Sequence, residues 1–272
     1  MRILTVATND TILSGLQRAL GKVADVLIYN PQVNSIYEAL YQNKFDLFLV
    51  EGHMIKPSII SAIEEFSLST IVFGHCEHKS AQFVLQLIPE HTLEVTPCVD
   101  NYNANVYTVD YAANLDIDCP NYPSSEVVVF NSLRSESDFL SEQLNKLRES
   151  QIPFKVVGNP INTSEYVGRV ELSDIIGLAK TAKISLCTTH EYIPDIALAR
   201  GFVYSDIEDP NLVNNLRYYL DNEEERAKTV KNLYSSVLSA HTYFHRLYDI
   251  FIKLNLPEEA QKCLQQIANY QS

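Results

Sequence analysis

Residues 166–206, YVGRVELSDIIGLAKTAKISLCTTHEYIPDIALARGFVYSD, contain the alternation of elements that decides the fold. Short apolar runs predict three strands, at residues 166–170, 183–187 and 202–205. Two helical patterns separate these strands, at residues 172–179 and 194–200, and Gly201 follows the second as a helix-ending glycine would. The order strand, helix, strand, helix, strand predicts half of a doubly wound α/β sheet.

Polar residues follow the second and third of these predicted strands. Thr188, His190 and Glu191 come directly after the second strand, and Asp206 follows the third. In an open α/β sheet the ligand binds in the crevice outside the carboxyl ends of the strands. The sequence therefore predicts a binding site that contains these side chains.

The composition is typical of a folded protein and argues against long nucleic-acid contacts. Of the 272 residues, 46% are hydrophobic and 20% are charged, which is enough to build a core in one large domain or two ordinary ones. The net charge of −13 disfavours an extended array of phosphate contacts. The eight glycines leave little room for a glycine-rich phosphate loop.

The cysteines and the N-terminus predict a cytoplasmic protein. The five cysteines are odd in number and scattered, a pattern typical of reduced thiols. The first residues, MRILTVATND, enter a strand directly and lack the architecture of a cleavable signal. No apolar run reaches the roughly 18 residues of a membrane span. We therefore expect a cytoplasmic chain without a membrane span.

The α/β pattern occurs in two halves of the chain. In the first half, helical patterns alternate with strand patterns at residues 2–7, 26–29, 45–50 and 70–73. The stretch 116–125, DIDCPNYPSS, has two prolines and no periodicity, and the pattern restarts after it at Glu126. The sequence therefore predicts two Rossmann-like domains with parallel sheets.

The predicted domain bounds follow from this break. We expect an N-terminal domain at residues 1–118, a C-terminal domain at residues 119–254 and a helical tail at residues 255–272. One long helix is expected at residues 236–254, with His241 and His245 on one of its faces. This helix and the tail are expected to cross back onto the first domain.

Several motifs of the second half resemble those of glycosyltransferases with the GT-B fold. They are a hydrophobic-glycine turn at residues 166–168, an "adi-l-p"-like strand at 182–186, a helix similar to E-A-x-A-x-G at 196–201, a "yL.deeer"-like segment at 219–226, and a match to the H-T-y-x-x-R signature of CgeB-like glycosyltransferases at 241–246. The chain is therefore similar to a divergent GT-B glycosyltransferase, CgeB-like or family 4-like. The similarity is weak but covers nearly the whole chain.

This resemblance implies two Rossmann-like domains with a cleft between them and a nucleotide-sugar donor held by the second domain. A UDP-sugar is the expected donor, with no further cofactor and no metal ion. A basic group on the donor diphosphate is expected at Arg134, and helix N-termini can stabilise the same charge. The donor-binding residues that we expect are Ser132, Arg134, Tyr166, Gly168, Thr188, His190, Glu191 and Asp195.

One position departs from the family pattern. The glutamate that opens E-A-x-A-x-G and holds the donor ribose is replaced by Ile196. Asp195 is adjacent, but one residue along a helix turns a side chain by about 100°. Three alternatives remain open: the register shifts by one so that Asp195 serves, the ribose is held by another group such as Glu191, or the site is inactive.

Two residues after first-domain strands are candidates for the catalytic base. His75 follows the fourth strand, and its ordinary pKa suits proton transfer from an acceptor hydroxyl. Asp10 follows the first strand, where it can also be a simple helix cap. A polar loop is the alternative for His75. The sequence 116–118 imitates a metal-binding D-x-D but lacks its strand context, so no metal site is predicted.

The function expected from the resemblance is transfer of a sugar from a nucleotide sugar to an acceptor hydroxyl. The acceptor stays open among a glycan, a small molecule, a protein and a modified base in DNA. The alternative is a non-catalytic nucleotide- or sugar-binding protein descended from such an enzyme, which Ile196 favours. A nucleotide-sugar epimerase is a weaker third hypothesis, because no G-x-G-x-x-G follows the first strand.

Overall fold

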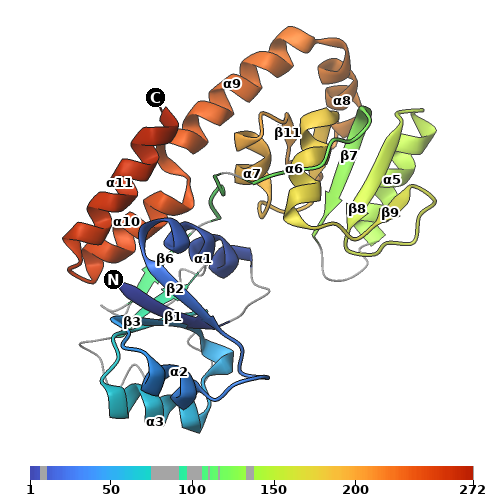
Figure 1. Cartoon of the computed structure of the whole chain (residues 1–272). Helices are drawn as coiled ribbons and strands as arrows, with labels where there is room; N and C mark the ends of the chain where they lie inside the picture. Colours follow the sequence, from blue (N-terminus) through green and yellow to red (C-terminus); the bar gives the residue numbers. More distant parts are fainter. Residues whose placement is uncertain are drawn as a thin grey trace. The chain divides into compact units, whose positions relative to one another are not determined.

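The computed structural model describes residues 1–6, 11–74, 92–96, 106–109, 111–115, 117–132 and 138–271 of the chain (Figure 1). The chain packs into two compact units. Unit 1 consists of Met1–Asp110 and Tyr243–Ser272, and unit 2 consists of Tyr111–Thr242. Each unit is built on one parallel sheet, so the predicted α/β class with two Rossmann-like units is confirmed.

Unit 1 has a six-stranded parallel sheet in the order β2-β1-β3-β4-β5-β6. Its strands are β1 (Arg2–Val6), β2 (Asp25–Tyr29), β3 (Leu47–Glu51), β4 (Thr70–Phe73), β5 (Thr92–Thr96) and β6 (Val106–Thr108). In the register of the sheet, Ile3 lies beside Val26 on one side and Leu47 on the other. All five residues of β3 are buried, as expected for a parallel strand covered on both faces.

The helices of unit 1 supply the cover for this sheet. Within the described residues they are α1 (Thr11–Val23), α2 (Ile36–Gln42), the 3₁₀ turn η1 (Gly52–Met54), α3 (Pro57–Phe66), α10 (Tyr243–Lys253) and α11 (Pro257–Gln271). The apolar side chains of α2 and α3, among them Ile36, Leu40 and Ile59, share one core with Phe48 and Val50 of β3. The amphipathic patterns of the sequence therefore place these helices against the sheet.

The C-terminal helices return to unit 1, as predicted. Helix α10 packs on α1, and the contact runs through Gly15. A Cβ added at Gly15 would lie 2.2 Å from the Cε2 atom of Tyr243, whose side chain is buried. Glycine at this position lets the tyrosine ring sit directly on the α1 backbone.

The prediction of one long helix at residues 236–254 is wrong. Helix α9 (Glu223–Ala240) ends at Ala240, and α10 begins anew at Tyr243. Between them the carbonyl oxygen of His241 accepts a hydrogen bond from the Ala113 backbone N–H at 2.8 Å, and Thr242 forms a β-bridge with Ala113. This pairing replaces helical hydrogen bonds, so His241 and His245 do not share a helix face.

The boundaries of the two compact units differ from the predicted domain bounds. Residues 111–118 belong to unit 2 and residues 243–254 to unit 1. The pairing of Ala113 with Thr242 explains the first difference, because it holds the connecting segment against the end of α9. The packing of Tyr243 on Gly15 explains the second.

Unit 2 has a five-stranded parallel sheet in the order β11-β10-β7-β8-β9. Its strands are β7 (Ser125–Asn131), β8 (Phe154–Gly158), β9 (Tyr166–Gly168), β10 (Ala182–Cys187) and β11 (Val203–Tyr204). Its helices are α5 (Asp138–Glu149), α6 (Leu172–Thr181), α7 (Ile193–Leu198), α8 (Leu212–Asp221) and α9. The strands and helices predicted for residues 166–206 are all present.

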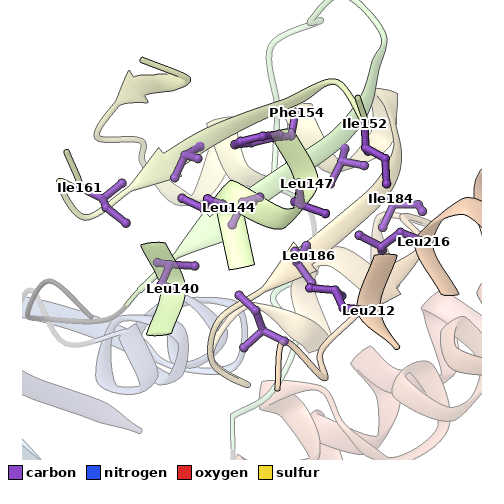
Figure 2. Packing of buried hydrophobic residues seen from close by; sticks show 14 of the residues in the cluster. Leu140, Leu144, Leu147, Ile152, Phe154, Ile161, Ile184, Leu186, Leu212 and Leu216 are labelled. Carbon is purple, nitrogen blue, oxygen red and sulfur yellow. The ribbon is translucent and has the colours of Figure 1, made fainter. Parts of the chain in front are cut away.

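Separate cores cover the two faces of this sheet. On one face, leucines of α5 and α8 share a core with Ile184 and Leu186 of β10, and Figure 2 shows Leu216 beside these two residues. On the other face, Ile175 of α6 and Ile196 of α7 pack on β7. Burial on both faces holds the strands in place, so the strand ends are fixed positions for a site.

No helix in the described parts of the chain combines the length and apolarity needed to span a bilayer.

Candidate functional site

The strand order of unit 2 places its topological switch point between the carboxyl ends of β7 and β10. From β7 the chain first moves outward to β8 and β9, and then returns to β10 on the other side of β7. The connections therefore diverge from the point between β7 and β10, which is where ligands of doubly wound sheets bind. Ser132 follows β7 and Thr188 follows β10, so the structure brings these two predicted residues together.

Hydroxyl groups join the two strand ends. The Ser132 backbone N–H donates to Thr188 Oγ1 at 3.1 Å, and this hydroxyl donates in turn to the Phe130 carbonyl at 3.2 Å. The side-chain hydroxyls of Ser132 and Thr189 are hydrogen-bonded to each other. The three residues, Ser132, Thr188 and Thr189, are half-buried, so solvent or a ligand can reach their hydroxyl groups. We call these three residues the hydroxyl floor. Thr189 is an addition to the predicted set.

An amide pair fixes the neighbouring end of β8. Asn131 Nδ2 donates to the Asn159 carbonyl at 3.0 Å, and Asn159 Nδ2 donates to the Ser132 carbonyl at 3.1 Å. The Asn159 backbone N–H also donates to the Asn131 carbonyl at 2.7 Å. These bonds set the backbone position of Ser132 from the opposite side to Thr188. In the sequence, Asn131 and Asn159 are visible only as polar turn residues after predicted strands, and nothing there indicates that they pair.

Gly158 has a conformation and a contact that exclude other residues. Its φ of +103° lies in the region that favours glycine, and an added Cβ would lie 2.3 Å from the Asn131 carbonyl oxygen. Close approach of β8 to β7 at this point therefore requires glycine. The amide pair of Asn131 and Asn159 depends on that approach.

Two predicted residues lie on β9, beside the same strand end. The Tyr166 hydroxyl donates to the Gly158 carbonyl at 3.0 Å, so Tyr166 positions the end of β8. Gly168 has a φ of +148°, and an added Cβ there would meet no atom within 4 Å. The backbone at Gly168 is therefore open to close approach by another molecule.

His190 and Glu191 occupy the loop between β10 and α7. His190 is exposed and Glu191 is half-buried. The Glu191 backbone N–H donates to Thr189 Oγ1 at 3.4 Å, which places the loop beside the hydroxyl floor. Burial first, and then the charge of Glu191, raise the pKa of the adjacent Tyr192 to about 12. Tyr192 is therefore a neutral phenol at physiological pH, and Glu191 supplies a carboxylate near the strand ends.

Asp195 lies on α7 and has a partner in the segment that enters unit 2. Its side chain is 2% exposed, and Oδ1 accepts hydrogen bonds from the Asn114 backbone N–H at 2.8 Å and from Asn114 Nδ2 at 3.1 Å. The neighbouring Ile196 is completely buried in the core beneath β7. Its side chain therefore does not occupy the place of the family glutamate at a ligand surface. The role of Asp195 as a ribose ligand stays a prediction.

Three predicted site residues lie outside the described residues. These are the base candidates Asp10 and His75 and the basic residue Arg134. The first residue of the D-x-D imitation, Asp116, is also outside them. Within the described residues, no three His, Cys, Asp or Glu side chains cluster closely enough to hold a metal ion.

In unit 1 a carboxylate–imidazole pair follows β3. The order of its sheet places the corresponding switch point between β1 and β3. Glu51 ends β3, and one of its carboxylate oxygens lies 3.0 Å from Nδ1 of His53 in η1. The Glu51 side chain is 11% exposed and that of His53 is 66% exposed. A buried carboxylate thus orients an accessible imidazole, a pair that the sequence signalled only as polar residues after a strand.

Comparison with known proteins identifies the fold. The sequence matches no protein-family model and no curated protein. The solved glycotransferase of kitacinnamycin is 8% identical, with a TM-score of 0.54 over 93% of this chain and 98% of that chain. The structure of S. aureus MnaA with UDP is 13% identical, with a TM-score of 0.53 over 94% of this chain and 97% of that one.

A third structure has the same fold. The UDP-GlcNAc 2-epimerase from Neisseria meningitidis bound to UDP-GlcNAc is 12% identical, with a TM-score of 0.51 over 94% of this chain and 100% of that chain. At these identities the likeness concerns the fold alone. It confirms the GT-B type of fold that the sequence predicted.

Proposed function

We propose that unit 2 binds the nucleoside diphosphate of a nucleotide sugar, and that the protein transfers the sugar to an acceptor hydroxyl without a metal ion. The observation that carries this proposal is the floor of hydroxyls where β7 and β10 end, made by Ser132, Thr188 and Thr189. A hydroxyl both donates and accepts hydrogen bonds, so Ser132 and Thr189 can turn from each other to the oxygens of a phosphate. Two of the solved structures with this fold hold UDP or UDP-GlcNAc, which supports a UDP-sugar as donor.

Negative charge builds on the leaving diphosphate as the glycosidic bond breaks. Hydrogen-bond donors at that position can stabilise the transition state more than the ground state. In our proposal Ser132 and Thr189 provide such donors, and Arg134, two residues further along the chain, provides the cation. Gly168 supports the same assignment, because its open surroundings allow the donor to approach the backbone.

We assign the donor ribose to Glu191. Asp195 is 2% exposed and its carboxylate is bonded to Asn114, whereas Glu191 is half-buried and its backbone is bonded to Thr189 of the hydroxyl floor. Ribose hydroxyls are donors, and a carboxylate acceptor gives them charge-assisted bonds.

For the base that accepts the proton of the attacking hydroxyl we retain His75 and Asp10 as candidates and add His53. With its Nδ1–H donating to Glu51, the imidazole of His53 presents the lone pair of Nε2. A carboxylate in this position also stabilises the imidazolium that forms on proton transfer. His53 is 66% exposed, so an acceptor molecule can reach it.

The second candidate function is a non-catalytic nucleotide-binding protein, and Ile196 is the observation that favours it. The side chain that would be a glutamate in the family pattern is fully buried in the core. A protein that has the hydroxyl floor but lacks part of the donor site would bind nucleotides without transferring sugar.

Calorimetric titration with UDP, UDP-glucose and UDP-GlcNAc tests donor binding. Thr189→Val keeps the shape of the side chain and removes its hydroxyl, so the affinity for each ligand should fall about tenfold. Thr229→Val, on α9 away from the strand ends, is the matched control and should leave the affinity unchanged. The proposal is rejected if none of the three ligands binds, or if both variants weaken binding equally.

Product analysis by NMR separates the two functions. Release of UDP in the presence of an acceptor mixture, with a new glycosidic signal, identifies transfer, whereas an altered sugar still attached to UDP identifies epimerisation. If His53 is the base, His53→Gln should reduce turnover at least about a hundredfold, within the range measured for general bases, and leave UDP affinity intact. Tight UDP binding with no product from any acceptor would favour the non-catalytic protein.

A further inference from the structure

A cavity of about 690 Å³ opens on unit 2 at the amino ends of β10 and β11, the opposite edge of the sheet from the hydroxyl floor. One wall is helix α9, and the other is formed by the start of β10 and the residues before β11. The volume lies within the range of small-molecule sites in proteins. Its lining includes Ala182, Phe202, Arg226, Val230 and Tyr234.

Cations predominate among the charged groups of this cavity. Lys183, Arg200, Arg226 and Lys231 line it, and Glu223 is the one carboxylate among the lining residues. Lys183 is paired with Glu126 at 2.8 Å. The four cations and the carboxylates of Glu223 and Glu126 together give a local net charge of +2, in a chain whose net charge is −13. Such a local reversal of sign focuses anions into the cavity.

Two of the cations are held in place by uncharged groups. The Arg200 guanidinium lies over the ring of Tyr234, 4.8 Å from its centroid. Arg226 Nη1 donates to the Leu220 carbonyl at 2.8 Å and to the Tyr219 carbonyl at the end of α8. A carbonyl contact orients Arg226 but does not neutralise it, and its other guanidinium nitrogens remain able to donate to an anion.

The end of α8 explains the position of Arg226, because cations are favoured at helix C-termini. It does not explain Lys231, which lies inside α9, or Arg200. Arg200 follows α7 with a φ of +61°, in the left-handed region where glycine or asparagine is usual. An arginine therefore occupies a left-handed position at which glycine is the usual residue, and its side chain lines the cavity.

We propose that this cavity binds a small organic phosphate. The phosphate group would contact Arg200 and Lys231, with Arg226 beside them. The organic part would lie on the apolar surface of Phe202 and Val230. A phosphate monoester carries a charge of about −1.5 to −2 near neutral pH, which matches the two unbalanced positive charges of the cavity. The planar guanidinium fork of arginine suits phosphate oxygens. This site is separate from the proposed donor site and does not depend on it.

Calorimetric titration of the full chain tests the site, with glucose 6-phosphate and AMP as probes and inorganic phosphate as reference. At least one ester should bind more tightly than inorganic phosphate, because only an ester gains the apolar contact. Binding of one ester alone identifies the organic part as a sugar or a nucleoside. Arg200→Gln and Lys231→Gln should each weaken that binding about tenfold, as expected for the loss of a charged hydrogen bond.

Controls separate this site from the donor site and from general charge effects. Lys228→Gln removes a cation from α9 that does not line the cavity, and its effect should stay below about twofold. Thr189→Val should leave the ester affinity unchanged, and Arg200→Gln should leave the UDP affinity unchanged. Lys231→Gln does not alter the contact with Tyr234, so it tests the site even if Arg200→Gln unfolds. The proposal fails if neither ester binds at millimolar concentration, if Lys228→Gln weakens binding as much as Lys231→Gln, or if only Thr189→Val abolishes it.

Discussion

Replacing Ile196 by glutamate would restore the residue type of the family pattern, and we predict that it destabilises unit 2 severely. Ile196 is fully buried among Val128, Phe130 and Ile175, and its Cγ2 atom lies 2.8 Å from where a Cβ of Gly201 would be. Loss of the buried aliphatic side chain costs about 1.5–3 kcal/mol. Burial raises the pKa of a carboxyl by about 3–5 units, so the folded protein would hold the introduced carboxyl neutral at pH 7.

Keeping that carboxyl neutral at pH 7 adds a second cost. The unfolded side chain ionises near pH 4.3, so the cost is about 1.36 kcal/mol for each of roughly 2.7 pH units, or about 3.7 kcal/mol. The total, roughly 5–7 kcal/mol, is comparable to the whole stability of an ordinary domain. Because the folded pKa is the higher one, the ionisation cost grows as the pH rises above about 4.3 and shrinks to about 1 kcal/mol at pH 5.

Urea unfolding followed by circular dichroism at pH 7 and pH 5 measures this effect. The midpoint for I196E should fall by about 2 M or more at pH 7 and recover partly at pH 5. Ile196→Val should lose only about 0.5–1.5 kcal/mol. Ile252→Glu makes the same chemical change at a side chain that is 50% exposed and should change stability by about 0.5 kcal/mol at most. Wild-type stability of I196E together with tighter UDP binding would refute the reasoning, because the carboxylate would then reach the ligand.

Two further predictions concern the strand ends of unit 2. Gly158→Ala should destabilise the protein by about 1–3 kcal/mol from backbone strain alone, and it should weaken UDP binding. The control is Gly21→Ala, which lies in a helix, has no neighbour within 4 Å of the new Cβ, and should stabilise the protein by about 0.5–1 kcal/mol. Equal urea midpoints for the two variants would contradict this prediction. Hydrogen bonds from Arg148 and then Thr163 lower the pKa of Glu165 to about 2, so its contribution to stability is present above about pH 4.5 and is lost as the pH falls toward 2. Arg148→Met should therefore lower the melting temperature at pH 7 but not at pH 2, and a loss that is equal at both pH values would show that Arg148 acts by packing.

The parts of the fold that depend on local pattern were predictable from the sequence. Parallel strands buried on both faces appear as continuous apolar runs, so β7 and β10 were visible as such, and Thr188 was expected at the carboxyl end of β10. The break between α9 and α10 was not predictable, because the helical pattern continues across it. It depends on Ala113, which pairs with Thr242 from far along the chain.

The same limit applied to the candidate site. Asn131 and Asn159 are ordinary turn residues until the sheet register places them together, and only then does Gly158 acquire its requirement for glycine. The hydrogen bond from Asn114 to Asp195 was not predictable either, because Asn114 lies 81 residues away in the sequence. The basic cavity likewise combines Lys183 and Lys231 from separate elements, and no local motif marks it.

The geometry of α7 bears on which carboxylate could take the ribose-binding role that we propose. The helix has six residues, and successive side chains point about 100° apart. Ile196 faces the core beneath β7, while Asp195 bonds to Asn114 and Leu198 packs with Ala113. The acidic residue within α7 is thus bound to the segment that enters unit 2. The carboxylate nearest to the hydroxyl floor along the chain is that of Glu191, which lies before the helix and whose backbone is bonded to Thr189. In the proposed function, a carboxylate placed before α7 serves the donor ribose, and the helix position can then be isoleucine.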